Sequence, residues 1–423
     1  MGTDAMTDRF GGTGAWWALV LAAAAIHAVF WFISQPEILF SDFYKAYFHA
    51  AEALLYEGPR PTWPVEEGST EVGFVNIPAV AWLFVPLVPL GEVPAAWVFL
   101  GLGAAATIGA YALILRFGRL GARAGVALLV LFLLNGPLVN SLREGNTTHF
   151  VLLLLVVALL LWRAKSEFAA GLVLGFCAII KLPLVLFGLY FLLRGRWRVV
   201  AGGATTIAAV VLVSLATFGL EINIGWYEAC IAPFTSGAIA AFNVQSIDGF
   251  LMRLATGASE IDNWFPLEPS TAHRVARIAL VAVLFIGAVW LIRRAARRAA
   301  PATGALSARD LREFMIVLVL ALVTTPVSWT HYYLFLLLPW GLYIGGQLEL
   351  PDDAVTRRLV WGSWILASLP VVAPPAQPEW LAELLSRTAV SAWLVGGFLM
   401  LAALARGAYM AARPRADMAL AKG

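Results

Sequence analysis

Long apolar runs separated by short polar segments recur along the whole chain. A helix needs about 20 consecutive apolar residues to cross the hydrocarbon core of a bilayer. The pattern therefore predicts an all-α, polytopic membrane protein with about 12 transmembrane helices, built as one domain over residues 1–423. The runs lie at residues 15–33, 76–90, 94–115, 125–141, 148–162, 169–193, 199–218, 275–292, 313–325, 331–349, 359–373 and 388–405.

Two of these runs differ from a plain membrane-spanning helix. Residues 76–90 are short and contain three prolines, which suits a re-entrant or surface-lying element, because proline breaks helices. Residues 169–193 are interrupted by Lys181 and Pro183, a charge beside a helix breaker. We expect two short helices there, which meet at a break that faces the outside.

The basic residues set the orientation. With these two adjustments they all fall on one side of the membrane, and the positive-inside rule makes that side cytoplasmic. Both termini are then cytoplasmic, the run 15–33 is an uncleaved first span, and residues 293–312 form a solvated loop. The basic segments are 116–123, 163–165, 194–198, 293–312, 357–358 and the tail from Arg406.

Two acidic segments fall on the opposite side. Residues 34–75 carry seven carboxylates against two Lys or Arg residues, and residues 219–273 carry six against one. We therefore expect extracytoplasmic loops over 34–93 and 219–273. Chemistry that faces outward would take place in these loops.

The composition excludes several classes of protein. Hydrophobic residues make up 61% of the chain and charged residues 13%, with a mean hydropathy of +0.81, which excludes a soluble globular protein. Cys177 lies in an apolar run, so a disulfide with Cys230 is not expected. The net charge of +3 carries no nucleic-acid signature.

Polar residues at membrane depth are costly and are therefore candidate functional residues. Four clusters of them fall on the outer side. In the first, residues 41–47, Asp42 begins an amphipathic helix over 43–57 that we expect to lie in the outer interface. Asp42 is either a reactive carboxylate or only the N-cap of that helix.

The second cluster is the turn 143–149, between two apolar runs. It is either a ligand-binding turn or a polar hairpin with an internal Arg143–Glu144 pair. The third is Lys181, which can anchor a lipid phosphate at the helix break. Snorkelling is the alternative for Lys181, but it suits a helix end better than a position in the middle of a run.

The fourth cluster, residues 325–333, is another break between apolar helices. A lone histidine is more often a satisfied core residue than a catalyst, but His331 stands among aromatic residues at the same outer level as the other clusters. The second outer loop adds Asn243, Gln245 and Ser246. Their amide and hydroxyl groups are of the kind that holds sugar hydroxyls, and they are also common in ordinary loops.

No metal site is expected on the outer side, which has no paired histidines, no cysteine pair and no Asp-x-Asp. We expect no other cofactor. A site that handles phosphate without a metal needs cationic side chains to stabilise the departing group. Lys181, Arg143 and His331 are the candidates.

The order and spacing of these motifs resemble those of glycosyltransferase family 87, multispanning enzymes that use polyprenyl-phosphate sugars. Two departures stand out: the Gln of the family's Gly-Gln-x-Asn motif is replaced in the run 143–146, and its double proline is Ile77 and Pro78. The matching segments are SDFYKAY, FVNIPAVAWLFVPLVPLG, REGNTTHF, AGLVLGFCAIIKLPLVL, NVQSIDGFLMRL and TTPVSWTHYY.

The resemblance implies a C-type glycosyltransferase fold in a bacterial inner membrane, with the active site at the outer face and inversion at the anomeric carbon. Asp42 would be the general base that takes a proton from the acceptor hydroxyl. Lys181 and His331, with Arg143, would hold the donor phosphate. The residues implied to contact substrate are Tyr44, Lys45, Tyr47, Asn146, Asn243, Gln245, Ser246, Trp329 and Tyr332.

The expected function is transfer of a hexose from a polyprenyl-phosphate donor to a glycolipid or glycan at the bilayer surface. Mannose is the favoured hexose. Arabinofuranose or another sugar could be moved by the same mechanism. A transporter or flippase for lipid-linked sugars is the alternative from a different class, because broken helices suit it equally. The chain shows no repeated halves and carries two large acidic outer loops, which favours the enzyme.

Overall fold

A computed structural model describes residues 39–61, 73–296, 306–369 and 371–411, with scattered positions between 21 and 29. Most of these residues are helical, and they form two isolated β-bridges but no extended strand. The all-α prediction is confirmed for this part of the chain. The apolar run 15–33 lies largely outside the described residues.

Several helices are long and apolar enough to cross a membrane. The described residues contain four such segments, or five if a pair of helices bent by 53° is counted as one span. The total of 12 crossings and the C-type fold stay predictions. The four segments are α4 (Glu92–Gly118), Trp197–Ser236, which is mostly α10 (Trp197–Cys230), α13 (Thr271–Ala296) and Glu379–Ala411, which ends in α18 (Ala392–Ala411); the bent pair is α5 (Ala122–Leu133) with α6 (Gly136–Arg143).

The helix break at Lys181 forms as predicted. Helix α8 (Glu167–Ile180) ends immediately before Lys181, whose backbone is extended. The chain resumes in a 3-10 turn, η5 (Leu182–Val185), followed by α9 (Leu186–Leu193). Pro183 lies in the first turn of η5, where its missing N–H leaves no helix bond unmade.

The segment 34–93, predicted to be an outer loop, also contains the predicted elements. A π-helical segment, η2 (Phe43–Phe48), continues directly into α3 (His49–Tyr56), within the helix expected over 43–57. The proline-rich run folds as two six-residue 3-10 helices, η3 (Pro78–Leu83) and η4 (Val85–Leu90). Each is far too short to cross a bilayer, in agreement with a re-entrant or surface position.

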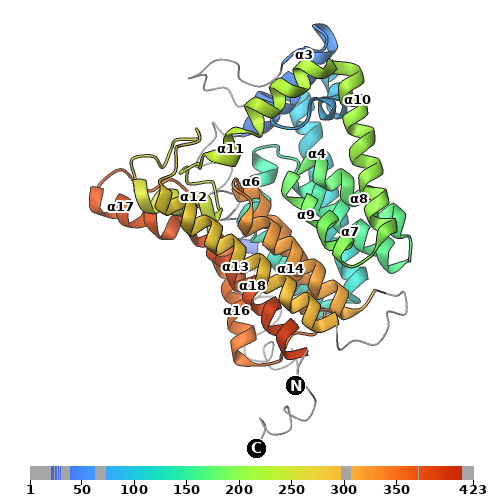
Figure 1. The fold of residues 1–423 in the computed structure, drawn as a ribbon, viewed down its shortest axis with the longest axis vertical. Coiled ribbons are helices and arrows are strands. Elements are labelled where there is room, and N and C mark those ends of the chain that lie inside the picture. The colour runs from blue at the N-terminus through green and yellow to red at the C-terminus, as the bar shows by residue number, and fades with distance from the viewer. Residues whose placement is uncertain are drawn as a thin grey trace, which may run out of the picture.

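Two groups of helices meet around α6. One contains α7 (Thr148–Arg163), α8, α9 and α10, and the other contains α13 with C-terminal helices (Figure 1). Helix α10 bends at Gly219, whose φ of 75° interrupts the helix, and its second part leads to α11 (Pro233–Ser236). The C-terminal elements are α14 (Ala308–Thr324), η6 (Thr330–Leu336), α15 (Leu337–Ile344), α16 (Ala354–Ser368), α17 (Glu379–Arg387) and α18; α12 (Ile247–Thr256) lies near α17.

The end of the basic segment 293–312 is not the solvated loop that its charges suggest. Helix α14 already begins at Ala308, and the Arg312 side chain is 2% exposed and donates hydrogen bonds to the Leu348 and Glu349 carbonyls. Glu313 is equally buried and pairs with Arg194 at 3.2 Å. The first turn of α14 packs inside the protein, and its charges are paired there rather than hydrated.

Glycines bring α8 and α10 into close contact. A Cβ built on Gly171 would collide with the Val199 carbonyl, and one on Gly202 would collide with the Phe168 carbonyl. Such contacts between helix backbones are typical of membrane helices, where small residues allow close approach. Cys177, on α8, and Cys230, on α10, are free and buried, as the sequence predicts.

Candidate active site

Three polar side chains from distant segments meet in one place. Asp42, Glu144 and His331 each direct an oxygen or nitrogen into a group whose atoms lie within 4.8 Å of one another. They come from the start of η2, the end of α6 and the 3-10 helix η6. Two of the sequence-predicted residues, Asp42 and His331, are therefore neighbours.

Backbone hydrogen bonds hold Asp42 against the end of α6. The amide of Phe40 donates to the Arg143 carbonyl at 2.7 Å, and the amide of Asp42 donates to the Glu144 carbonyl at 2.9 Å. Gly145 makes this docking possible: its φ is +68°, and a Cβ there would collide with the Cβ of Phe43. Asp42 has no side-chain cap hydrogen bond, so its carboxylate is not used as a helix cap.

Asn146 connects Asp42 with Lys181. Its Nδ2 donates to Asp42 Oδ2 at 2.5 Å, and its Oδ1 accepts from Lys181 Nζ at 3.0 Å. The same Oδ1 accepts from the backbone and the hydroxyl of Thr148, at 3.1 and 2.7 Å. These bonds fix the orientation of the amide, which assigns its oxygen to the ammonium and its nitrogen to the carboxylate.

Lys181 lies on the opposite side of Asn146 from Asp42. Its side chain is 5% exposed, and its Nζ lies 5.0 Å from the centre of the Tyr332 ring. Among the described residues no carboxylate lies within 4 Å of Lys181 Nζ, and the nearest negative charges that act on it are those of Asp42 and Glu144. Such a buried ammonium can bind an entering anion.

His331 completes the group from η6. Its Nδ1 lies 3.6 Å from Glu144 Oε2, its ring packs edge-on against Tyr332, and its buried Nε2 has no hydrogen-bond partner in the described part of the chain. The segment before it is held by a hydrogen bond of 2.9 Å from the Thr330 amide to the Asn243 carbonyl. An unpartnered ring nitrogen at a buried polar group is available to a ligand.

Arg143 is buried beside Glu144 rather than beside Asp42. One guanidinium nitrogen donates to Asn140 Oδ1 at 2.6 Å and lies 3.8 Å from Glu144 Oε1. The Arg143–Glu144 pair that the sequence suggests is therefore present. Glu144 also faces His331, so the turn is more than an isolated polar hairpin.

The aromatic residues predicted to contact substrate divide between two faces of the first helix. Tyr47 is buried on the side of Asp42, stacks on Phe84 at 4.7 Å and directs its hydroxyl to Thr147 Oγ1 at 3.4 Å. Tyr44 is half-buried and lines a separate pocket, while Lys45 is exposed.

The polar residues predicted in the segment 219–273 have structural partners. The Gln245 amide donates to the carbonyls of Phe242 and Val390 and accepts from the Leu394 amide. The Ser246 hydroxyl caps α12, and Asn243 Oδ1 accepts from the Trp264 indole. Trp329 forms a β-bridge with Val244, which joins this loop to the segment that carries His331.

Burial and charge shift the acid–base properties of both carboxyl groups, which lie outside the candidate spanning helices. Burial raises the pKa of Asp42, and the nearby Glu144 raises it further, whereas His331, Asn146 and Lys181 lower it. Burial raises the pKa of Glu144 to about 7, against the opposing effect of Arg143. Both carboxyls therefore hold their protons to higher pH than exposed ones.

The same three residues must be tested as a metal site, which the sequence did not suggest. Two carboxylates and an imidazole are suitable donors for a divalent cation. The charge around them opposes one, because Lys181 is joined through Asn146 to Asp42 and the Arg143 guanidinium lies beside Glu144. Positive charge near the two carboxylates repels a cation and so weakens the case for a metal here.

Glu144 is the site residue that the sequence reasoning missed. Its adjacency to Arg143 suggested an internal pair, and only the fold places it beside Asp42 and His331. The sequence did contain a signal that could have drawn attention to Glu144. This residue lies in the four-residue run, 143–146, that departs from the family motif.

Comparison with known proteins gives a family. The model of glycosyltransferase family 87 matches residues 74–326, more than half of the chain. The chain belongs to glycosyltransferase family 87. The family 87 match includes Arg143, Asn146 and Lys181, but Asp42 and His331 lie outside it, so their place in the site rests on the geometry.

Characterised relatives come from mycobacteria. One from Mycolicibacterium smegmatis, a polyprenol-phosphate-mannose-dependent alpha-(1-2)-phosphatidylinositol mannoside mannosyltransferase, is 28% identical over 62% of this chain and 56% of its own length. The corresponding phosphatidylinositol pentamannoside mannosyltransferase of the same organism is 29% identical over 77% of this chain and 72% of its own. The chain thus spans little more than half of the first relative. No solved structure matches it.

Proposed function

We propose that this protein is an inverting glycosyltransferase that moves a sugar, mannose, from a polyprenyl-phosphate donor to a hydroxyl of a glycolipid or glycan acceptor. The mycobacterial relatives are named for polyprenol-phosphate mannose and phosphatidylinositol mannosides, which supports this donor and this class of acceptor. The observation that carries the proposal is the hydrogen-bonded connection of Asp42, Asn146 and Lys181, with His331 beside it.

The reaction forms one bond and breaks one. The acceptor oxygen attacks the anomeric carbon from the face opposite the phosphate, and the bond between that carbon and the phosphate oxygen breaks. The acceptor proton passes to the Asp42 carboxylate, and the polyprenyl phosphate leaves with the bonding electron pair. One carboxylate is sufficient, because a phosphate leaves without the strong protonation that an alcohol needs.

Each side chain then has a defined task. Asn146 holds the Asp42 carboxylate in position through its hydrogen bond. Lys181 and the free Nε2 of His331 stabilise the negative charge that grows on the leaving phosphate, as fixed cationic groups and donors do in a buried site. Arg143 acts from behind Glu144 and contributes positive potential rather than a direct contact.

We place this site at the extracytoplasmic face of a bacterial inner membrane, with both termini in the cytoplasm. The support is the charge distribution: in the topology predicted from the sequence, the basic segments between spans fall on one side and the acidic loops on the other. Asp42 belongs to the first acidic loop, and the loop 219–273 contributes the backbone that holds the segment before His331.

Transfer by purified protein tests the proposal. The full-length protein, reconstituted with polyprenyl-phosphate mannose and phosphatidylinositol mannosides, should form a new glycosidic product. Asp42→Asn should remain folded and bind donor but lose transfer by at least about 100-fold. Asp262→Asn, an exposed carboxylate of the second outer loop, is the matched control and should keep full activity. Retained turnover by Asp42→Asn would exclude it as the base.

Lys181 is tested separately through donor binding. Lys181→Met keeps most of the side-chain volume and removes the charge, so donor affinity should fall about tenfold or more while the protein stays folded. Unchanged donor affinity would exclude a phosphate contact. Movement of labelled donor across vesicles without any glycosidic product would support a flippase instead.

A further inference from the structure

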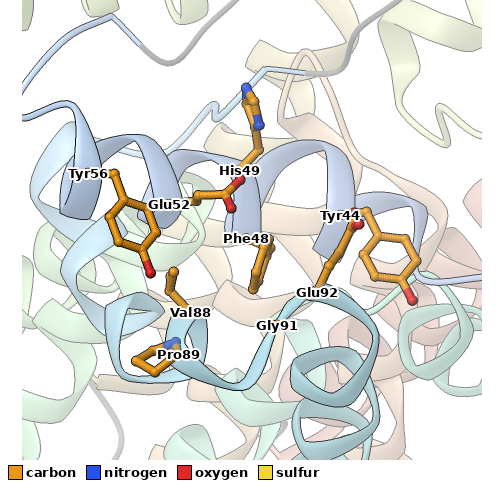
Figure 2. A pocket seen from close by; sticks show the side chains of 9 residues that line it. All are labelled: Tyr44, Phe48, His49, Glu52, Tyr56, Val88, Pro89, Gly91 and Glu92. Carbon is orange, nitrogen blue, oxygen red and sulfur yellow. The ribbon is translucent and has the colours of Figure 1, made fainter.

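A pocket lies on the other face of the helix that begins at Asp42. It has a volume of about 510 Å³ and lies between η2 and α3 on one side and the segment from Val88 to Glu92 on the other (Figure 2). Tyr44, Phe48, Glu52 and Tyr56 recur at every fourth residue and so form one stripe along the helix. The volume is within the usual range for a small-molecule site.

The two carboxylates of this pocket have no partners in the described part of the chain. Neither Glu52 nor Glu92 forms a hydrogen bond or an ion pair with another residue that the structure describes. The Glu92 side chain points toward the helix, between Phe48 and Tyr44. The His49 side chain, on that helix, points away from the segment 88–92 (Figure 2). None of the described residues that line the cavity is a lysine or an arginine.

This chemistry favours a neutral, hydroxyl-rich ligand. Ionised carboxylates only accept hydrogen bonds, and sugar hydroxyls donate them. Tyrosine rings offer an apolar face and a polar tip, which matches the alternating surface of a sugar ring. Two unpaired carboxylates repel a phosphate, and the polar lining does not suit an isoprenoid chain.

The surroundings indicate that the ligand also has a lipid tail. Leu90, Val93 and Trp97 are 47%, 56% and 56% exposed on the segment that leads from the pocket into α4. Helix α4 is long and apolar enough to span a membrane, so its first turns lie near the headgroup level. A tryptophan and aliphatic residues beside a polar pocket suit a molecule with a sugar headgroup and acyl chains.

The pocket lies close to the candidate active site along the first helix. Phe40 packs edge-on against both Tyr44 and Trp97, with ring centres 5.8 and 5.2 Å apart. Tyr44 follows Asp42 by only two residues, and the Phe40 amide is bonded to the end of α6. A headgroup bound here is therefore adjacent to the candidate active site and separated from it by a single turn of chain.

We propose that this pocket binds neutral sugar residues in the headgroup of a membrane glycolipid, with any phosphate of that lipid outside the pocket, and that this glycolipid is the acceptor. The second statement rests on the proposed function, whereas the first does not. The pocket would hold the part of the acceptor that does not react, so that binding energy from distant sugars positions the reacting hydroxyl.

Photo-crosslinking tests the binding without any reaction. A phosphatidylinositol mannoside with a diazirine on its sugar should label peptides that contain residues 44–56 or 88–92 of the full-length protein in nanodiscs. Labelling should fall about tenfold in the double variant Glu52→Gln, Glu92→Gln and be unchanged in the control Glu57→Gln, because Glu57 pairs with Arg60 and does not line the pocket. Equal labelling of wild type and double variant would overturn the proposal that this pocket binds the sugar.

Competition with unlabelled molecules tests whether the pocket recognises the sugar and whether the lipid tail is part of the ligand. Unlabelled phosphatidylinositol mannoside should suppress labelling, whereas phosphatidylinositol without sugar should not. Suppression by methyl α-D-mannoside at the same low concentration as the glycolipid would show that the lipid tail is not part of the ligand and would overturn that part of the proposal.

Kinetics then test the role as acceptor. The double variant should raise KM for the acceptor about tenfold and leave KM for the donor at its wild-type value. If wild type is labelled but transfers no sugar, the proposed function is rejected and the pocket remains a glycolipid-binding site. If the double variant transfers sugar with an unchanged acceptor KM, the proposed function stands and the pocket is not the acceptor site.

Both carboxylates are at least partly exposed, so the variants should fold, as their Tm will show.

Discussion

The amide nitrogen of Asn146 donates to Asp42 Oδ2 while the oxygen of the same amide accepts from Lys181 Nζ. The proposed base and the proposed phosphate ligand are thereby held by one planar group. A shift of either side chain pulls on the other, so the distance between proton acceptor and phosphate site is fixed before substrate enters. Such preorganisation is the main way in which a buried polar site lowers a barrier.

Removal of this bridge should damage both functions. Asn146→Ala should lower kcat about 10- to 100-fold and raise KM for the donor, because Asp42 loses a hydrogen-bond donor and Lys181 loses its acceptor. Steady-state kinetics with varied donor measure both effects. Asn263→Ala, on the second outer loop, is the control. A kcat and a donor KM within twofold of wild type would show that the bridge is dispensable.

The pH profile should report the carboxylate pair. Asp42 must be ionised to act as base, and its pKa is raised by burial and by Glu144, so kcat/KM should fall on acidification at a higher pH than for an exposed aspartate. Glu144→Gln removes one raising influence and leaves Lys181 and His331 in place, so the acid limb should move to lower pH. The Tyr47 and Tyr332 hydroxyls stay neutral in this range.

The control for this shift is Glu144→Asp, which keeps the charge and should keep the limb near its wild-type position. An acid limb that is the same in wild type and Glu144→Gln would show that Glu144 does not act on the base.

Chelation should leave transfer unchanged. Lys181 and Arg143 supply positive charge close to Asp42 and Glu144, so the mechanism needs no divalent cation. Activity in EDTA should stay within twofold of activity in added Mg²⁺ or Mn²⁺. Loss in EDTA with recovery on adding one of these ions would instead assign Asp42, Glu144 and His331 as a metal site.

A buried arginine holds the loop within residues 219–273 in shape. Arg253 donates from one nitrogen to the carbonyls of Ala240, Ala241 and Val244 and from another to Ser391 Oγ. Arg253→Met should leave these groups unpaired, at about 1–3 kcal/mol for each buried group, and lower Tm. Because this loop binds the backbone before His331, activity should fall as well. Arg274→Met, an exposed residue of α13, is the control.

The features that the sequence predicts well are those with a local physical cause. A charge beside a proline within an apolar run is costly anywhere except at a break, and the structure ends α8 immediately before Lys181. The amphipathic segment after Asp42 is helical for the same kind of reason, because its apolar positions repeat with helical spacing.

Long-range pairing could not be predicted in this way. Gln245 has the same amide group as Asn146, yet its hydrogen bonds go to backbone groups as distant in sequence as Val390. Composition and spacing cannot distinguish an amide that closes a loop from one that orients a catalytic group. For the same reason the sequence predicts only an ion pair between Glu144 and its neighbour Arg143. The contact of Glu144 with His331 exists only in the folded chain.

The glycine contacts between α8 and α10 influence the candidate active site from a distance. Lys181 follows the last residue of α8, so the position of this helix against α10 sets where the ammonium points. A single methyl at Gly171 or Gly202 would push the two backbones apart. Loss-of-function alleles in a genetic screen should therefore gather at these glycines, although neither touches a reacting atom.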